Sequence, residues 1–162
     1  MKLTERVLDW LQAGAHVLDL AIRLYVAQVF LRSGLLKIGN WDGTLYLFEN
    51  EYKVPLLPPE PAAWLGTFAE LFFPVFLALG LAARFAALSL SLFNIVAVIS
   101  FWHVLSTNQA ALNSHWYWGA LLAVTLFHGP GKLSLDYWIW TRWAAAPALE
   151  AARPDLSRQA SG

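Results

Sequence analysis

The stretch AAWLGTFAELFFPVFLALGLA, residues 62–82, decides the fold class of this chain. It contains a single charged residue, Glu70, and its length matches the roughly 20 apolar residues that a helix needs to cross a bilayer. Pro74 follows Glu70 by four positions, so it removes the hydrogen bond to the Glu70 carbonyl and predicts a kink. The stretch therefore predicts a membrane-spanning helix with an acidic side chain inside it.

The composition of the whole chain supports the same class. Hydrophobic residues make up 58% of the chain and charged residues only 14%, against about 25% charged residues in soluble domains. A soluble four-helix bundle is the alternative, but it would need a polar stripe along each helix. The net charge of zero argues against nucleic acid as a partner. The absence of cysteine excludes disulfides and thiol redox chemistry within this chain.

Further apolar runs complete a predicted all-α, integral membrane four-helix bundle embedded in lipid. We expect its spans at roughly residues 17–37, 62–82, 85–105 and 113–128. The last run is short for a hydrocarbon layer of about 30 Å, so a re-entrant fourth segment is the alternative. We divide the chain into an N-terminal amphipathic segment, the membrane domain and a flexible cytoplasmic tail, over residues 1–16, 17–140 and 141–162. We expect the first segment to be either a helix on the membrane surface or an extension of the first span.

The distribution of basic residues predicts the orientation. The loop of residues 38–61 is acidic and residues 106–115 carry no Lys or Arg, whereas Arg84 and the basic residues near both termini lie on the other side. By the positive-inside rule we expect both termini in the cytoplasm and the protein in the bacterial cytoplasmic membrane. The acidic loop is too apolar for a plain linker, and we expect a short helix around 42–52 that closes one mouth of the bundle.

Polar residues within the spans indicate a candidate pocket in the outer half of the bundle. Its predicted members are Gln28, Arg32, Lys37, Glu70 and His103. Charges in hydrocarbon are costly, which makes them functional candidates. Gln28 and Arg32 are four residues apart and share a helix face, which we expect to point into the bundle. The alternative is a structural ion pair between Arg32 and Glu70 that fixes helix register.

A second set of residues belongs to the predicted cytoplasmic face. Its members are Arg23, Arg84, Gly129, Gly131, Ser134 and Asp136. Gly129-Pro130-Gly131 ends the fourth run, because Pro lacks an N–H donor and Gly permits unusual backbone angles. We expect Ser134 to cap an interfacial helix with Asp136 in its first turn. The alternative pairs Asp136 with Arg84 or Arg23 and makes this face a docking surface. Asp19 and Arg23, four residues apart, are expected to pair.

The histidines do not have the spacing of a metal site. No pair among His103, His115 and His128 is three or four residues apart, the separation that a helical metal site uses. We therefore expect no intrinsic metal or haem, and interpret each as a single histidine near a membrane interface.

Four segments together resemble the DoxX family of small four-helix bacterial membrane proteins. They are RLYVAQVFLRSGLLKI (23–38), Glu70, LGLAARFAAL (79–88) and HGPGKLSLD (128–136). The loop ENEYKVPLLPPEPAAWLGTFAEL (49–71) is similar to a subgroup encoded beside multinuclear iron-dependent oxidases that modify peptides for metal handling. The resemblance implies association with quinone-dependent or stress-related redox complexes, and it assigns no catalytic residue.

Three functions from different classes remain open. The first is an accessory or scaffold subunit that docks a redox or peptide-maturation enzyme. The second is a quinone-linked oxidoreductase component with the outer-half pocket as its site. The third is a small transporter, which would have to be a homo-oligomer because the chain has no repeat and few helices. We do not expect an autonomous enzyme.

Overall fold

The computed structural model describes the backbone of residues 2–151 and the side chains of residues 6–143. All regular structure in this part of the chain is helical, which confirms the all-α prediction. The helices are α1 (Lys2–Gly39), α2 (Trp41–Asn50), α3 (Pro59–Leu79), α4 (Ala83–Ser100), α5 (Trp102–Leu105), α6 (Gln109–His128) and α7 (Leu135–Ala151).

Three of these helices, within the described residues, are long and apolar enough to cross a membrane. They are α1 over Arg6–Gly39, α3 and α4. Large apolar side chains such as Ile95 and Ile99 are exposed on the surface of α4. A helical bundle with an apolar exterior is stable in lipid rather than in water. The structure therefore confirms the class of an all-α membrane bundle.

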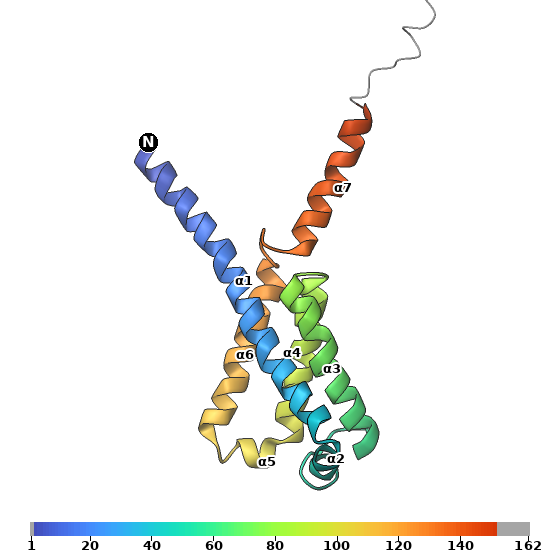
Figure 1. Ribbon diagram of the computed structural model, residues 1–162. Helices are drawn as coiled ribbons and strands as arrows, with labels where there is room; N and C mark the ends of the chain where they lie inside the picture. The colour runs from blue at the N-terminus through green and yellow to red at the C-terminus, as the bar shows by residue number, and fades with distance from the viewer. Residues whose placement is uncertain (1, 152–162) are drawn as a thin grey trace, which may run out of the picture.

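Helices α1, α3, α4 and α6 pack side by side, and the remaining helices lie at the two ends (Figure 1). Helices α2 and α5 are at one end, which we call the α2/α5 end. Helix α7 and the N-terminal part of α1 extend from the opposite end, which we call the α7 end. Helix α6 has 20 residues and a length of about 30 Å at a rise of 1.5 Å per residue.

Several element boundaries differ from the expected ones. Residues 2–16 and the first predicted span form one continuous helix of 38 residues, because no strong helix breaker separates them. Its length of about 57 Å is almost twice the hydrocarbon thickness of about 30 Å. Helix α4 ends at Ser100, before residue 105, and α6 begins at Gln109, before residue 113.

Two segments outside the predicted spans, the acidic loop and the start of the C-terminal tail, contain helices. Helix α2 is the short helix expected within the acidic loop, and the Asn40 side chain caps it by accepting a hydrogen bond from the Gly43 N–H at 3.1 Å. Residues 141–151, expected to be a flexible tail, continue helix α7, in keeping with the high helix propensity of their alanines. The rest of that predicted tail, residues 152–162, lies outside the described residues.

The core lies where the four packed helices meet. Its buried members are Val26, Ala27, Phe30, Leu77, Ala86, Ala87, Leu90 and Leu122. The two α4 alanines allow neighbouring backbones to approach closely, as small residues do in membrane bundles. A smaller cluster of Phe48, Ala62 and Ala63 fixes α2 on α3. Above this core the α2/α5 end is less densely filled.

Candidate functional site

A cavity of about 660 Å³ lies at the α2/α5 end of the bundle. Residues from α1 to α6 line it, together with the segment that follows α2. Most of its lining is apolar or aromatic, and the aromatic members are Phe30, Phe48, Tyr52, Phe93, Phe101 and Trp118. Apolar cavities of this size with a few polar groups are typical of small-molecule sites.

One wall of the cavity carries a buried ion pair. Lys37 Nζ of α1 lies 2.5 Å from Glu70 Oε2 of α3, and both side chains are largely shielded from solvent. The Lys37 ammonium also donates to Ser33 Oγ at 3.0 Å, and Ser33 in turn donates to Glu70 Oε1 at 3.1 Å. Both carboxylate oxygens are therefore bonded, and two of the three ammonium hydrogens are used.

The helices bring this pair together through a close approach. Gly34 lies one turn before Lys37, and a Cβ added there would meet Leu71 Cγ at 2.8 Å and Glu70 Cβ at 3.1 Å. Only glycine allows α1 and α3 to come this near. Lys37 and Glu70 can then bond directly across the interface.

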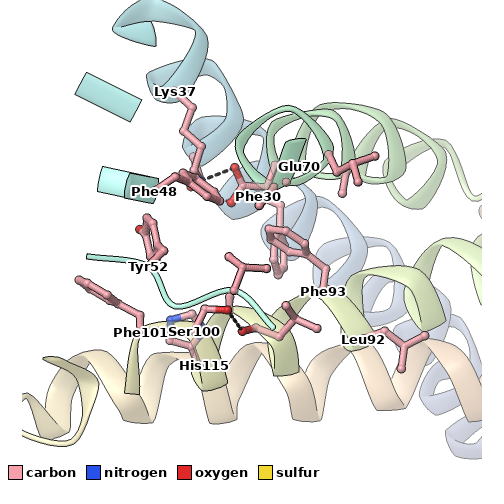
Figure 2. Close-up of a pocket in the computed structure, with 18 of the residues that line it drawn as sticks. Phe30, Lys37, Phe48, Tyr52, Glu70, Leu92, Phe93, Ser100, Phe101 and His115 are labelled. Atoms are coloured by element: carbon pink, nitrogen blue, oxygen red, sulfur yellow. Dashed lines mark hydrogen bonds and ion pairs between the residues drawn. The ribbon is translucent and has the colours of Figure 1, made fainter. Parts of the chain in front are cut away.

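The opposite wall carries a second polar group. His115 of α6 lines the cavity, and its Nδ1 lies 2.8 Å from Asn94 Oδ1 of α4. Figure 2 shows Lys37 and Glu70 on one side of the cavity and His115 and Ser100 on the other. The Ser100 hydroxyl donates to the Val96 carbonyl of its own helix at 2.7 Å. The cavity is thus apolar between two polar walls.

Tyr52 lies on the aromatic side of the cavity, after the end of α2. Its ring lies 4.8 Å from that of Phe48 and 4.8 Å from that of Phe101, measured between centroids. Burial raises the pKa of the Tyr52 phenol, and the negative charge of Glu70 raises it further. The phenol therefore stays protonated over the physiological range and remains a hydrogen-bond donor.

The five predicted pocket residues do not all meet. Lys37 and Glu70 are joined, and Arg32 lines the cavity but has an exposed side chain. Gln28 is exposed and does not line the cavity, so of the two residues expected to point inward only Arg32 borders it. His103 pairs with Glu51 at 3.4 Å and is not among the cavity-lining residues.

Helical periodicity explains this placement. The buried positions of α1 in its C-terminal half are Arg23, Val26, Ala27, Phe30 and Gly34, which form one stripe at helical spacing. Lys37 continues that stripe, whereas Gln28 and Arg32 fall outside it. For this reason Glu70 bonds to Lys37, and the expected bridge from Arg32 to Glu70 is replaced.

At the α7 end, Arg23 is completely buried and bonds to backbone carbonyls. Its Nη1 donates to Leu77 at 3.2 Å and to Ala78 at 2.9 Å, near the C-terminus of α3. Its Nη2 donates to the Leu133 carbonyl. A cation is favourable at a helix C-terminus, so the position of Arg23 at the end of α3 is stabilising. Because it also bonds to Leu133, Arg23 joins α3 to the loop before α7.

Asp136 lies in the first turn of α7, as expected, but its side chain also caps a second helix. Its two carboxylate oxygens accept from the Ala82 N–H at 2.8 Å and the Ala83 N–H at 2.9 Å, at the N-terminus of α4. Its own N–H donates to the Gly80 carbonyl at 2.9 Å. Asp136 is therefore an N-terminal cap for α4 supplied from the first turn of α7, and neither proposed arginine is its hydrogen-bond partner in the described chain.

The other residues assigned to the predicted cytoplasmic face also lie at or near helix ends. Ser134 caps α7 as expected, since its Oγ accepts from the Tyr137 N–H at 3.2 Å. Gly129 and Gly131 have φ values of 99° and 73° at the end of α6. Arg84 Nη2 lies 3.5 Å from the Phe127 carbonyl, at the limit of a hydrogen bond.

Asp19 has a partner that the sequence did not indicate. Its side chain is 7% exposed and Oδ1 lies 3.2 Å from His128 Nδ1, more than a hundred residues away in sequence. The expected pair with Arg23 is not formed, since each of the two side chains turns to a different partner. In the described part of the chain, no three or more His, Cys, Asp or Glu side chains gather to hold a metal ion.

The sequence missed Ser33 and His115 as cavity residues, and Asn94 as the hydrogen-bond partner of His115. Asn94 and His115 lie on neighbouring helices 21 residues apart, and only their packing brings them to 2.8 Å. Ser33 lies four residues before Lys37, and this spacing was the available signal.

Comparisons with known proteins give a consistent result. The DoxX family model matches residues 18–103, which include Lys37 and Glu70. An uncharacterised protein of Haemophilus influenzae is 32% identical over 130 residues, covering 76% of this chain and 83% of the relative. No solved structure matches the chain.

Proposed function

This chain belongs to the DoxX family of membrane proteins, and on that premise we propose that it is the ligand-binding membrane subunit of a redox system. Its ligand would be a quinone, bound in the cavity at the α2/α5 end. The observation that carries this proposal is a cavity of about 660 Å³ with the Lys37–Glu70 pair on its wall.

The chemistry of the cavity suits a flat ring with a polar oxygen. The rings of Phe30, Tyr52 and Phe93 can flank such a ring in stacked or edge-to-face contacts. Two hydrogens of the Lys37 ammonium are engaged by Ser33 and Glu70, which leaves the third available for a ligand oxygen. A charge-assisted hydrogen bond of this kind is about twice as strong as a neutral one.

A purely structural role for the ion pair explains less. A buried pair contributes little net stability unless its geometry is very good, because both ions lose their hydration. A structural pair would be expected in a densely packed region, yet this one borders the cavity. Binding of a ligand accounts for both the pair and the space beside it.

We infer the arrangement in the membrane from the charges at the two ends. Asp42, Glu49, Glu51 and Glu60 lie at the α2/α5 end, whereas Arg84, Lys132 and Arg142 lie at the α7 end. With α1, α3, α4 and α6 as four spans, the positive-inside rule puts the α7 end and both termini in the cytoplasm of a bacterial cell. The cavity would then face the outer half of the cytoplasmic membrane.

A second candidate function is a scaffold for a protein partner, either a redox or a peptide-maturation enzyme. Gln28 is exposed on α1 away from the cavity, and Arg32, which borders the cavity, also has an exposed side chain. Exposed polar and charged groups on a membrane helix are costly in contact with lipid. The α7 side chains Trp138, Trp140 and Trp143 are exposed at 53%, 75% and 78%. Both surfaces would be stabilised by a partner or a second copy, so scaffold and ligand binding are compatible.

The test is to purify the full chain in a mild detergent and search for a bound quinone. Organic extraction and mass spectrometry should find quinone at close to one per chain, and decylubiquinone should bind in calorimetry. The proposal fails if no quinone is extracted and decylubiquinone does not bind. Recovery of a soluble enzyme without any quinone would favour the scaffold.

A further inference from the structure

The wall opposite Lys37 and Glu70 carries a hydrogen-bond acceptor with a defined direction. His115 lines the cavity from α6, and its ring packs edge-on against Trp118 with centroids 4.9 Å apart. In Figure 2 the His115 ring lies across the cavity from the ion pair, with the Phe30 and Phe93 rings between the two walls. A ligand that fills the cavity would therefore touch both polar walls.

Asn94 decides which nitrogen of His115 carries the proton. The Asn94 side chain is buried, and its Nδ2 donates to the His115 backbone carbonyl at 3.0 Å. This bond orients the amide, so that Oδ1 is the atom 2.8 Å from His115 Nδ1. Because Oδ1 can only accept, Nδ1 must carry the hydrogen.

The other ring nitrogen, Nε2, is then a lone-pair acceptor in the neutral ring. None of the described residues forms a hydrogen bond with it, and the ring borders the cavity. The two walls thus make opposite demands on a ligand. Lys37 offers an N–H to an oxygen, whereas His115 needs an O–H or N–H from the ligand.

We propose that His115 makes this site selective for the reduced, hydroxyl-bearing form of its ring ligand. The inference rests on the proposed function and adds the redox state of the ligand. A quinol can donate one hydroxyl to His115 Nε2, and its other oxygen can accept from Lys37. A quinone presents only carbonyl oxygens, so its lone pair would face the lone pair of Nε2.

The size of the preference follows from the hydrogen bond that only the quinol makes. A single net hydrogen bond changes affinity on the order of ten-fold. Preference for the reduced form raises the midpoint potential of the bound ligand, by about 30 mV for a ten-fold ratio in a two-electron couple. The subunit would therefore favour transfer of electrons onto the ligand that it holds.

Calorimetry on the full chain in detergent tests this, with decylubiquinol and decylubiquinone as the two probes under anaerobic conditions. The native protein should bind decylubiquinol about ten-fold more tightly. His115→Phe keeps a flat ring without the acceptor and should bring the two affinities together. Asn94→Leu leaves His115 in place but frees its tautomer, so the preference should fall even if His115→Phe does not fold.

His103→Phe is the matched control, because His103 lies at the same end of the bundle but is not among the cavity-lining residues. It should keep the ten-fold preference. Equal binding of the two probes to the native protein, or a preference that survives both His115→Phe and Asn94→Leu, would overturn this inference and leave the proposed function standing. Failure of both probes to bind would overturn the two together.

Discussion

The two ends of the bundle use similar charged side chains in opposite ways. At the α7 end, Arg23 and Asp136 bond to backbone carbonyls and N–H groups of helix ends, and each joins two distant segments. At the α2/α5 end, Lys37 and Glu70 bond to each other and to one serine, beside a cavity. The role of a charged side chain in a membrane bundle therefore follows from its partners and from the space around it, and its depth alone does not reveal that role.

The largest effect should come from the α7 end. Arg23→Leu removes three hydrogen bonds to carbonyls, and of these only the Leu77 carbonyl keeps another donor, the Gly80 N–H. We expect a loss of about 2–5 kcal/mol in the free energy of unfolding, because two carbonyls lose their donor at about 1–3 kcal/mol each. Thermal unfolding in detergent would measure it. Arg32→Leu is the matched control, since that side chain is exposed and its loss should cost little; equal losses would contradict the comparison.

A smaller loss is expected where the loop before α7 crosses the α3–α4 turn. Gly80 has a φ of 66°, and a Cβ there would lie 2.5 Å from both Arg23 Nη1 and Ser134 Cβ. Gly80→Ala should therefore cost about 1–3 kcal/mol of unfolding free energy. Gly14→Ala, where nothing lies within 4 Å of the added Cβ, should be neutral or stabilising by up to about 1 kcal/mol. Similar melting temperatures for the two variants would show that this turn is not tightly packed.

The cavity end should respond in ligand affinity more than in stability. Glu70→Gln keeps an acceptor for Lys37 but removes the charge, and we expect about 1–2 kcal/mol less stability. Decylubiquinone affinity should fall on the order of ten-fold, because Lys37 loses the partner that orients it. Calorimetry and thermal unfolding measure the two effects. Lower stability with unchanged affinity would mean that the pair is structural.

Glu51→Gln is the control for that measurement. Glu51 lies at the same end but pairs with His103 outside the cavity, and its side chain is 43% exposed. Its replacement should leave both affinity and stability almost unchanged.

The smallest effect should come from the remote cap on α4. Asp136→Asn keeps the side-chain shape but can accept from only one of the two N–H groups, and it removes a charge from a helix N-terminus. We expect about 1 kcal/mol less stability. Glu60→Gln changes an exposed acid in the first turn of α3 and isolates the contribution of charge alone. If Asp136→Asn also lost a co-purifying enzyme that the native protein retains, this face would be a docking surface.

The fold class could be predicted because it depends on local apolar length. Residues 62–82 are long enough and apolar enough to span a bilayer whatever they pack against, and α3 forms over Pro59–Leu79. Ends marked by strong local signals were also predictable, such as the cap at Ser134 and the stop at Gly129. For residues 2–16 the sequence left two options open, a surface helix or an extension of the first span, and the continuous α1 is the second of these.

The site was predictable only in part. Lys37 and Glu70 stand out as charges in apolar runs, and the structure joins them. Arg32, the partner considered for Glu70, was wrong because charge and depth do not say which face of α1 is buried. That face is set by the small and apolar residues around Gly34. Asn94 and His115 gave no signal, since an amide and a histidine on separate helices are common in sequences.

The sequence by itself determined a helical membrane protein, the positions of its apolar runs and the residues that end them, because these follow from hydrophobic length and backbone chemistry. Only the tertiary structure decided that Arg23 and Asp136 cap helices distant from their own, and that Lys37 and His115 face each other across one cavity. The reason is physical: a buried polar group takes whichever partner packing brings within about 3 Å, and that choice is made between helices, not along them.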